Sequence, residues 1–256
     1  MTLTLDLARF FDFVLVLART ATLVAVMPVF SGRHVPAQVK VLASAALALL
    51  ITATIPSSGV SLDAGLLLVL LVAREAVIGL ALGTVASLIF HAVEYAGELA
   101  GMQMGFAIAG VLDPQSGRQV PLLSKFQSTL LTLMFLAIGG HLFVLRGLLD
   151  SFLVLPGGVL TLGVGGPLAL VQLFGKMFTI GLQVAAPATI FLLLVNVCLG
   201  VIARLVPQMN VFIVGFPLMI TCGLLMIMVS MPAFGGVAQH LVGEVLRDMH
   251  TVLGAM

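Results

Sequence analysis

The chain has 256 residues, of which 61% are hydrophobic and only 8% are charged, against roughly 25% charged residues in a soluble domain. Its 11 basic and 10 acidic residues leave a formal net charge of +1, which excludes an electrostatic footprint for nucleic acid. A surface this apolar has to meet lipid or other protein almost everywhere, so the composition indicates an integral membrane protein.

Six long apolar runs predict an all-α, membrane-type protein with about six hydrophobic helices. A helix needs about 20 apolar residues to cross a bilayer core, whereas a spanning strand would need about 10 alternating residues, and these runs do not alternate. In chain order the runs cover about 7–27, 38–55, 62–90, 122–145, 168–199 and 211–229. The first run lacks a basic leader, so it is expected to be a retained helix.

Proline positions suggest where some of these helices end. Pro28, Pro56 and Pro232 follow the first, second and sixth runs and are expected to close them. Pro187 lies inside the fifth run. The glycine-rich stretch 156–167 is expected to be a loop.

Arg74 and Glu75 interrupt the third run. Adjacent residues on a helix point about 100° apart, so these two side chains are not expected to face each other. A charge at bilayer depth costs about 3 kcal/mol or more, so each needs a partner on another helix or a wet cavity. An ion or proton pathway is one interpretation. Pairing between helices or subunits is favoured, because no second charged row completes a relay.

His91, Glu94 and Glu98 are spaced i, i+3, i+7 along the next stretch. Carboxylate and imidazole at i, i+3 occur in di-iron bundles, but that pattern requires a second copy on another helix, and the sequence has none. Polar contacts between helices or subunits are therefore expected at Glu94 and Glu98. Arg204, at the edge of a later connection, is expected in the same kind of contact.

Gly97, Gly101 and Gly105 repeat at four-residue spacing. On a helix they would line one face, and small residues at that spacing let another backbone approach closely. This pattern predicts close helix packing, either within the chain or against another subunit. The single cysteines, Cys198 and Cys222, are likewise interpreted as small packing residues inside apolar runs.

The segment that follows, up to Pro121, is too polar and too rich in glycine for a lipid-facing span. Asp113-Pro114 and Ser116-Gly117 favour turns, and apolar residues flank them. One interpretation is a surface loop. The other is a loop that folds inward to obstruct a cavity, since irregular backbone in a membrane assembly is tolerated where protein buries it or where it lines water.

Signatures of enzymes are absent from the sequence. No serine lies in a G-x-S-x-G context, and there is no P-loop and no dinucleotide fingerprint. We therefore predict no catalytic, cofactor-binding or metal-binding residues and a protein that is not an enzyme.

Four stretches together resemble the FliR family, called SctT in virulence-type secretion. They are RTATLVAVMPVFSGRHVPAQVKVLASAALALL (19–50), EYAGELAGMQMGFAIAGVLDPQSG (94–117), GGHLFVLRGLLDSFLVLP (139–156) and LGVIARLVPQMNVFIVGFPLMITCGLL (199–225). Their order and spacing cover nearly the whole chain. Gly140-His141 and Asp113-Pro114 resemble the flagellar branch, whereas Leu218 and Met219 stand where the family has a lysine soon after Phe216-Pro217.

The resemblance implies one domain with a FliP-like part, about 1–165, followed by a FliQ-like helical hairpin, about 166–256. Pro187 is expected to break the fifth helix into the bent hairpin of this FliQ-like part. It implies a core subunit of the flagellar type III export gate, in the bacterial inner membrane at the flagellar basal body. One such subunit would assemble with several copies of FliP and FliQ, with FlhB docked on the cytosolic side, and unfolded flagellar proteins would pass through. No cofactor is implied.

The resemblance also implies that one loop plugs the closed pore. By position this loop corresponds to about 106–121. The expected plug residues are Phe106, Ile108, Gly110, Val111, Leu112, Asp113, Pro114 and Gln115.

The main alternative is a secondary transporter or a channel subunit of another kind. A transporter is expected to have broken or charged helices at matching positions in its two halves. Pro187 has no counterpart in the first half of the chain, which disfavours this alternative.

Overall fold

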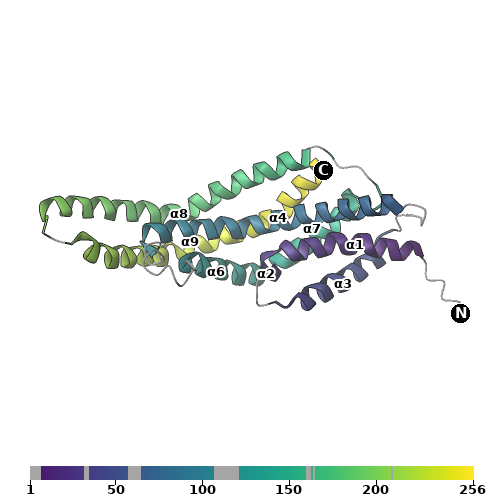
Figure 1. The fold of residues 1–256 in the computed structure, drawn as a ribbon, viewed down its shortest axis with the longest axis horizontal. Coiled ribbons are helices and arrows are strands. Elements are labelled where there is room, and N and C mark those ends of the chain that lie inside the picture. Colours follow the sequence, from purple (N-terminus) through teal and green to yellow (C-terminus); the bar gives the residue numbers. More distant parts are fainter. Residues whose placement is uncertain are drawn as a thin grey trace. The chain divides into compact units, whose positions relative to one another are not determined.

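The computed structural model describes residues 7–31, 35–56, 65–106, 121–159, 163, 165–208 and 210–256, and the regular elements in these ranges are all helices (Figure 1). In chain order they are α1 (Leu7–Val26), α2 (Pro28–Ser31), α3 (Ala37–Thr54), α4 (Gly65–Gln103), α6 (Leu122–Ile138), α7 (Gly140–Val154), α8 (Gly165–Leu205) and α9 (Val211–Ala255). The predicted all-α class is thus confirmed.

Several helices are longer than their apolar runs predicted. α4 continues to Gln103, through the polar residues around Glu94. α8 is one helix with Pro187 inside it, so the expected hairpin break at this proline is wrong. α9 continues past Pro232, which was expected to end it. Beyond Pro187 the residues of α8 are again apolar, and beyond Pro232 the last part of α9 buries Leu241, Val245 and Met249. A proline removes one hydrogen bond of its helix, and α8 and α9 continue past that local loss.

The fourth run, in contrast, is divided. α6 and α7 meet at Gly139 with a bend of 69°, and Gly139 has a positive φ of 80°.

Four described helices, α3, α4, α8 and α9, are long and apolar enough to cross a membrane, or five spans result if the bent α6–α7 pair counts as one. The sequence-based number of about six is therefore approximate. α1 carries Arg9, Asp12 and Arg19, which lower its apolar character below that of the other long helices.

The chain divides into two compact units. Unit 1 comprises 1–88, 139–174 and 243–256, and unit 2 comprises 89–138 and 175–242. Both units draw on residues from either side of the expected boundary near residue 165, which stays a prediction.

Unit 1 is built on α1, which packs against α3, with the first part of α4 and the whole of α7. Its buried apolar side chains include Leu15, Leu23, Leu71, Ile78 and Leu148.

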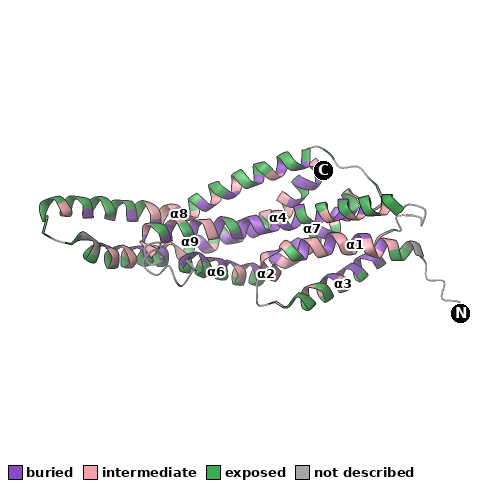
Figure 2. Ribbon diagram, viewed as in Figure 1, coloured by how far each residue is buried: buried purple, intermediate pink, exposed green. Residues whose placement is uncertain are grey.

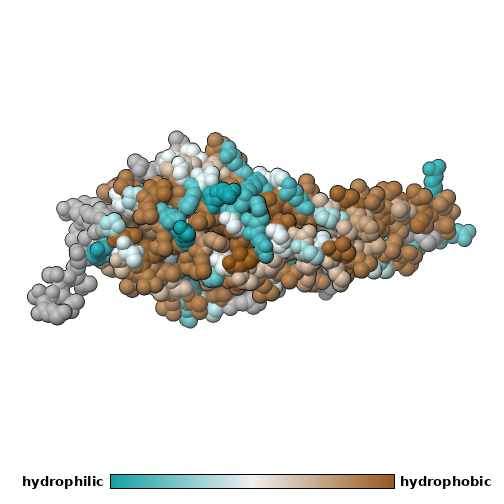
Figure 3. Space-filling view, turned by 180° about the vertical axis from the view of Figure 1, so that it is seen from behind, coloured by the Kyte–Doolittle hydropathy of each residue, from teal (hydrophilic) through white to brown (hydrophobic). Residues whose placement is uncertain are grey.

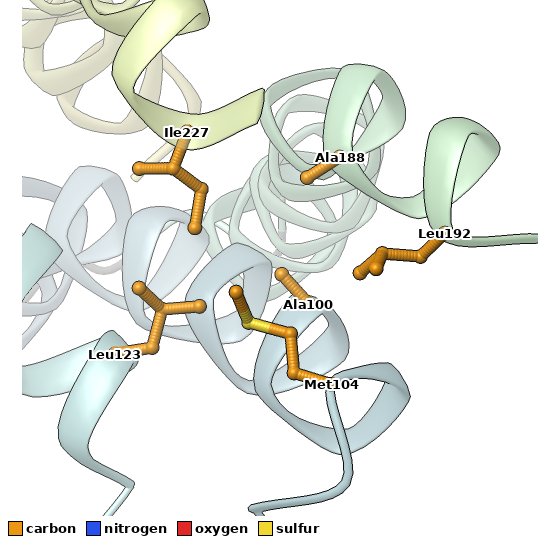
Figure 4. Packing of buried hydrophobic residues seen from close by; sticks show 6 residues of the cluster. All are labelled: Ala100, Met104, Leu123, Ala188, Leu192 and Ile227. Carbon is orange, nitrogen blue, oxygen red and sulfur yellow. The ribbon is translucent and has the colours of Figure 1, made fainter. Parts of the chain in front are cut away.

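Unit 2 has a compact apolar cluster formed by four helices and the turn after α4. Ala100, Met104, Leu123, Ala188, Leu192 and Ile227 point toward one another (Figure 4). Phe90 and Phe135 add an edge-to-face contact between α4 and α6, with ring centroids 5.3 Å apart.

Much of the surface of the long helices is apolar. Figure 2 shows long exposed stretches on α3, α8 and α9, and in Figure 3 hydrophobic side chains dominate the visible face. In α8 the exposed large side chains extend from Leu168 to Leu205, and in α9 from Ile213 to Val237. These helices present to their surroundings the kind of side chain that soluble proteins bury.

Candidate functional site

A buried charged cluster joins three helices of unit 1. We call it the Glu75 cluster and define it as Arg19 of α1, Arg74 and Glu75 of α4, and Ser151 of α7. Arg19 donates Nε–H to Glu75 Oε2 at 2.6 Å, and Arg74 donates from Nη1 to Glu75 Oε1 at 2.8 Å. Each guanidinium therefore occupies a different oxygen of the same carboxylate.

The contact between Arg74 and Glu75 corrects the expectation that these neighbours would not interact. Their Cα–Cβ bonds diverge as the helix requires, but the long arginine side chain bends back to reach the carboxylate. The angle of about 100° between neighbouring residues of a helix fixes only the direction of each Cα–Cβ bond. The long arginine side chain can still reach the carboxylate of the next residue.

α7 and the two residues after it supply further acceptors to the cluster. Arg19 donates to Ser151 Oγ and to the Leu155 carbonyl, each at 2.9 Å, and Arg74 donates to the Pro156 carbonyl at 3.3 Å. The last carbonyls of a helix have no partner inside it, so the end of α7 provides ready acceptors. The Phe152 ring lies 4.0 Å from Arg19 Cζ and covers the guanidinium.

Burial makes this pairing necessary. The side chains of Arg19 and Glu75 have no exposed surface and that of Arg74 is 3% exposed. Unpaired charges at such depth are strongly destabilising. The cluster holds α1, α4 and α7 together within the chain, and its geometry contains no nucleophile paired with a base.

The sequence indicated that Arg74 and Glu75 need buried partners, but it did not indicate that Arg19 is the partner of Glu75. A signal was present, because Arg19 lies inside a long apolar run, whose other charges are Arg9 and Asp12, and faces the same requirement for a counter-charge. Ser151 had no comparable signal, since a serine in an apolar helix is common.

The other expected polar contacts occupy different environments. Ser128 of α6 donates to Glu94 Oε1 of α4 at 3.0 Å, which is a contact between two helices of unit 2. Glu98 and Arg204 are exposed, and within the described ranges neither forms an ion pair. The three histidine and glutamate residues between 91 and 98 do not form a metal site: among the described residues there is no group of three or more metal-binding side chains.

The three spaced glycines have three different roles. A Cβ on Gly97 would lie 2.5 Å from Ser124 Cα, so α4 and α6 approach closely there. At Gly101 the nearest atoms would be 3.9 Å away, an ordinary contact. Gly105 lies beyond the end of α4 with a φ of 89°, so the three do not line one helical face as expected.

The expected plug begins at the end of α4. Phe106 is partly buried and packs against the apolar cluster of unit 2. The remaining expected plug residues, Ile108, Gly110, Val111, Leu112, Asp113, Pro114 and Gln115, lie outside the described residues.

Together these features define an all-α membrane-type protein whose buried charges are paired between helices. Comparison with known proteins identifies the family. The model of the family described as bacterial export proteins, family 1, matches residues 10–245.

Individual relatives of the chain support the same family. The chain is 33% identical to flagellar biosynthetic protein FliR of Escherichia coli (strain K12), over 94% of this chain and 92% of the relative. It is 34% identical to the protein of that name in Bacillus subtilis (strain 168), over 94% of each chain. The chain therefore belongs to the FliR family of bacterial export proteins. This membership supports a role in flagellar export, as a transport component, and its apolar helices suit a membrane location.

Proposed function

We propose that this protein is a core subunit of the flagellar type III export gate in the bacterial inner membrane, at the flagellar basal body. In this proposal its FliP-like and FliQ-like parts assemble with several copies of FliP and FliQ around an entry pore. FlhB docks on the cytosolic side, and unfolded flagellar proteins pass through. The subunit performs no chemistry, and the energy for transport comes from elsewhere.

The observation that carries the proposal is the length of the apolar helices. α4, α8 and α9 have 39, 41 and 45 residues, or about 58, 62 and 68 Å at 1.5 Å per residue. A bilayer core is about 30 Å thick, and even a tilt of about 40° would place only about 26 residues of a helix inside it.

Exposed apolar side chains nevertheless continue along these helices. In α4 they occur near both ends, at Leu66 and Met102, and in α8 they reach Leu205. The parts that exceed the bilayer need another apolar cover, and sibling subunits of the same gate supply it in this proposal.

Co-purification tests the assembly. A tagged chain, extracted from membranes under mild conditions, is expected to bring FliP and FliQ with it in a stable complex. Recovery of the chain as a folded, lipid-embedded monomer would reject its role as a gate subunit. Saturable uptake of a solute by the chain expressed alone would instead favour a transporter.

The plug is proposed to be segment 106–121, which fills the pore at rest and moves aside when substrate engages. Deletion of Gly110–Gln119 is expected to leave the complex assembled and to make the membrane conduct ions. A deletion of the short polar connection Ser57–Ser61 serves as the control and is expected to leave conductance low. An assembled complex with unchanged conductance after the first deletion would reject the plug while leaving the gate assignment intact.

A further inference from the structure

Glycines occur at three of the four points where the chain passes from one unit to the other. α8 passes between Phe174 and Gly175, α9 between Val242 and Gly243, and the α6–α7 junction between Ile138 and Gly139. Two of these glycines lie in the interior of long helices, where glycine is less favourable than alanine.

Close packing does not explain the two helical glycines. A Cβ added at Gly175 or Gly243 would meet no atom within 4 Å. Two other glycines of the same helices are in tight places: at Gly181 a Cβ would lie 2.8 Å from the Ala92 carbonyl oxygen, and at Gly223 it would clash with Met104, whereas Gly200 and Gly236 are as open as Gly175 and Gly243. Alanine would fit at 175 and 243 and would stiffen the helix, so the space around these positions gives no reason for glycine.

The third crossing is already bent. Gly139 adopts a positive φ of 80° and separates α6 from α7 at an angle of 69°. Glycine adopts this backbone conformation without the strain that a side chain would add. The fourth crossing, in α4 between Leu88 and Ile89, has no glycine, and the side chains on either side are buried.

We propose that Gly175 and Gly243 are hinge points at which α8 and α9 bend, with Gly139 as the third flexible joint and α4 as the continuous connection. Glycine lowers the resistance of a helix to bending, because it lacks a side chain that restricts φ and ψ. Hinge motions are absorbed by a few such positions while the packing on either side is kept. Neither glycine belongs to the apolar cluster of unit 2 or to the Glu75 cluster, so bending at them disturbs neither.

Distances between spin labels on α8 test the hinge directly. Cys198 and Cys222 are first replaced by alanine in the full chain. Labels at Leu168 and Leu182 then flank Gly175, and labels at Ile190 and Leu205 flank Gly200, which also has nothing within 4 Å of its Cβ position. All four positions are exposed, and each pair spans roughly 21–23 Å of helix.

The distance distribution across Gly175 is expected to be broader than that across Gly200. Gly175→Ala is expected to narrow the first distribution, whereas Gly200→Ala leaves the second unchanged. Equal widths in the native chain, or a distribution that Gly175→Ala does not narrow, would overturn the hinge. The width of these distance distributions reports bending of α8 whether or not the proposed export function is correct.

A cellular experiment tests whether the bending is used. The double variant Gly175→Ala/Gly243→Ala is expected to lose most secretion of flagellar proteins at unchanged abundance of the chain. The matched double variant Gly200→Ala/Gly236→Ala places alanines in the same two helices, also in open space, and is expected to secrete normally. Normal secretion by the first variant, or an equal loss in both, would show that bending at these glycines has no part in export.

Discussion

The carboxylate of Glu75 binds two buried arginines at once. Arg19 and Arg74 each donate to one of its oxygens, and all three side chains are almost fully buried. Removing one member of a buried charged group costs about 3–5 kcal/mol, much more than the group contributes relative to apolar replacements. The cluster is therefore a strict requirement on this sequence rather than a large source of stability.

Substitution of Glu75 by glutamine tests this requirement. Glu75→Gln keeps the size of the side chain but removes the charge shared by two guanidiniums, so we expect a loss of about 3–5 kcal/mol and a lower midpoint of thermal unfolding. Glu98→Gln makes the same change at an exposed position of the same helix and is expected to have almost no effect. Equal unfolding midpoints for the two variants would contradict the role of the cluster.

The glycines of α4 allow a second test at the scale of one methyl group. Gly97→Ala would place Cβ 2.5 Å from Ser124 Cα, on backbone that cannot move aside without separating α4 from α6. Overpacking of this kind costs about 1–3 kcal/mol. Gly101→Ala, with 3.9 Å available, is expected to be neutral or slightly stabilising. Denaturation of both variants in detergent should show a loss of stability for Gly97→Ala alone, and an equal loss for Gly101→Ala would refute the assignment of the close helix contact to Gly97.

The long helices α8 and α9 contain Pro187, Pro217 and Pro232 without ending. Each proline lacks the N–H that would donate to the carbonyl four residues earlier, and its ring crowds that carbonyl. The penalty is local and about 3 kcal/mol, whereas apolar side chains continue on both sides of each proline. Helices with internal prolines depend for their stability on the packing of their apolar side chains against other protein or lipid. The exposed apolar side chains of α8 and α9 offer the surface for such packing.

The break between α6 and α7 depends on one backbone conformation. Gly139→Ala is expected to destabilise the protein by about 1–2 kcal/mol, because an L-residue is strained at positive φ. Space is not the limitation, since the nearest side-chain atom would be 3.6 Å away. Gly157→Ala, with 3.8 Å and no positive φ, is the control and should unfold like the native protein. Identical unfolding midpoints for the two variants would show that the positive φ of Gly139 does not strain an alanine there.

For the whole molecule, the main requirement is a cover for its apolar surface. The exposed side chains of α3, α8 and α9 include leucine, valine, isoleucine and phenylalanine over most of each helix. Lipid covers only the length that fits within the bilayer. If the proposed gate is correct, a chain without FliP and FliQ would expose the remainder to water and would aggregate or be degraded.

Expression of the chain alone measures this dependence. We expect a short half-life in pulse–chase labelling and recovery of the half-life when FliP and FliQ are produced together with the chain. A soluble protein of similar size serves as the control for general proteolysis. A long half-life without either partner would be evidence for a self-sufficient membrane protein.

The helical class and the approximate position of each helix could be predicted from the apolar runs, because length and composition decide them locally. The need of Glu75 for a buried partner was also predictable from its depth. The identity of that partner was not, since it depends on α1 and α4 packing side by side with 56 residues between Arg19 and Glu75. The expected break at Pro187 and the expected end at Pro232 are wrong, because the rule that proline interrupts a helix is local and both helices continue beyond their prolines.

The pairing of Arg19 has a consequence for biosynthesis. At about 5–20 residues per second, the ribosome adds Glu75 about 3–11 s after Arg19, and Ser151, 132 residues after Arg19, about 7–26 s after it. During the first interval the newly made α1 carries the Arg19 guanidinium without the Glu75 carboxylate that binds it in the folded chain, and a charge at bilayer depth opposes entry into hydrocarbon by about 3 kcal/mol. The nascent α1 should therefore wait at the membrane interface until α4 emerges, so that the two helices are inserted as a pair.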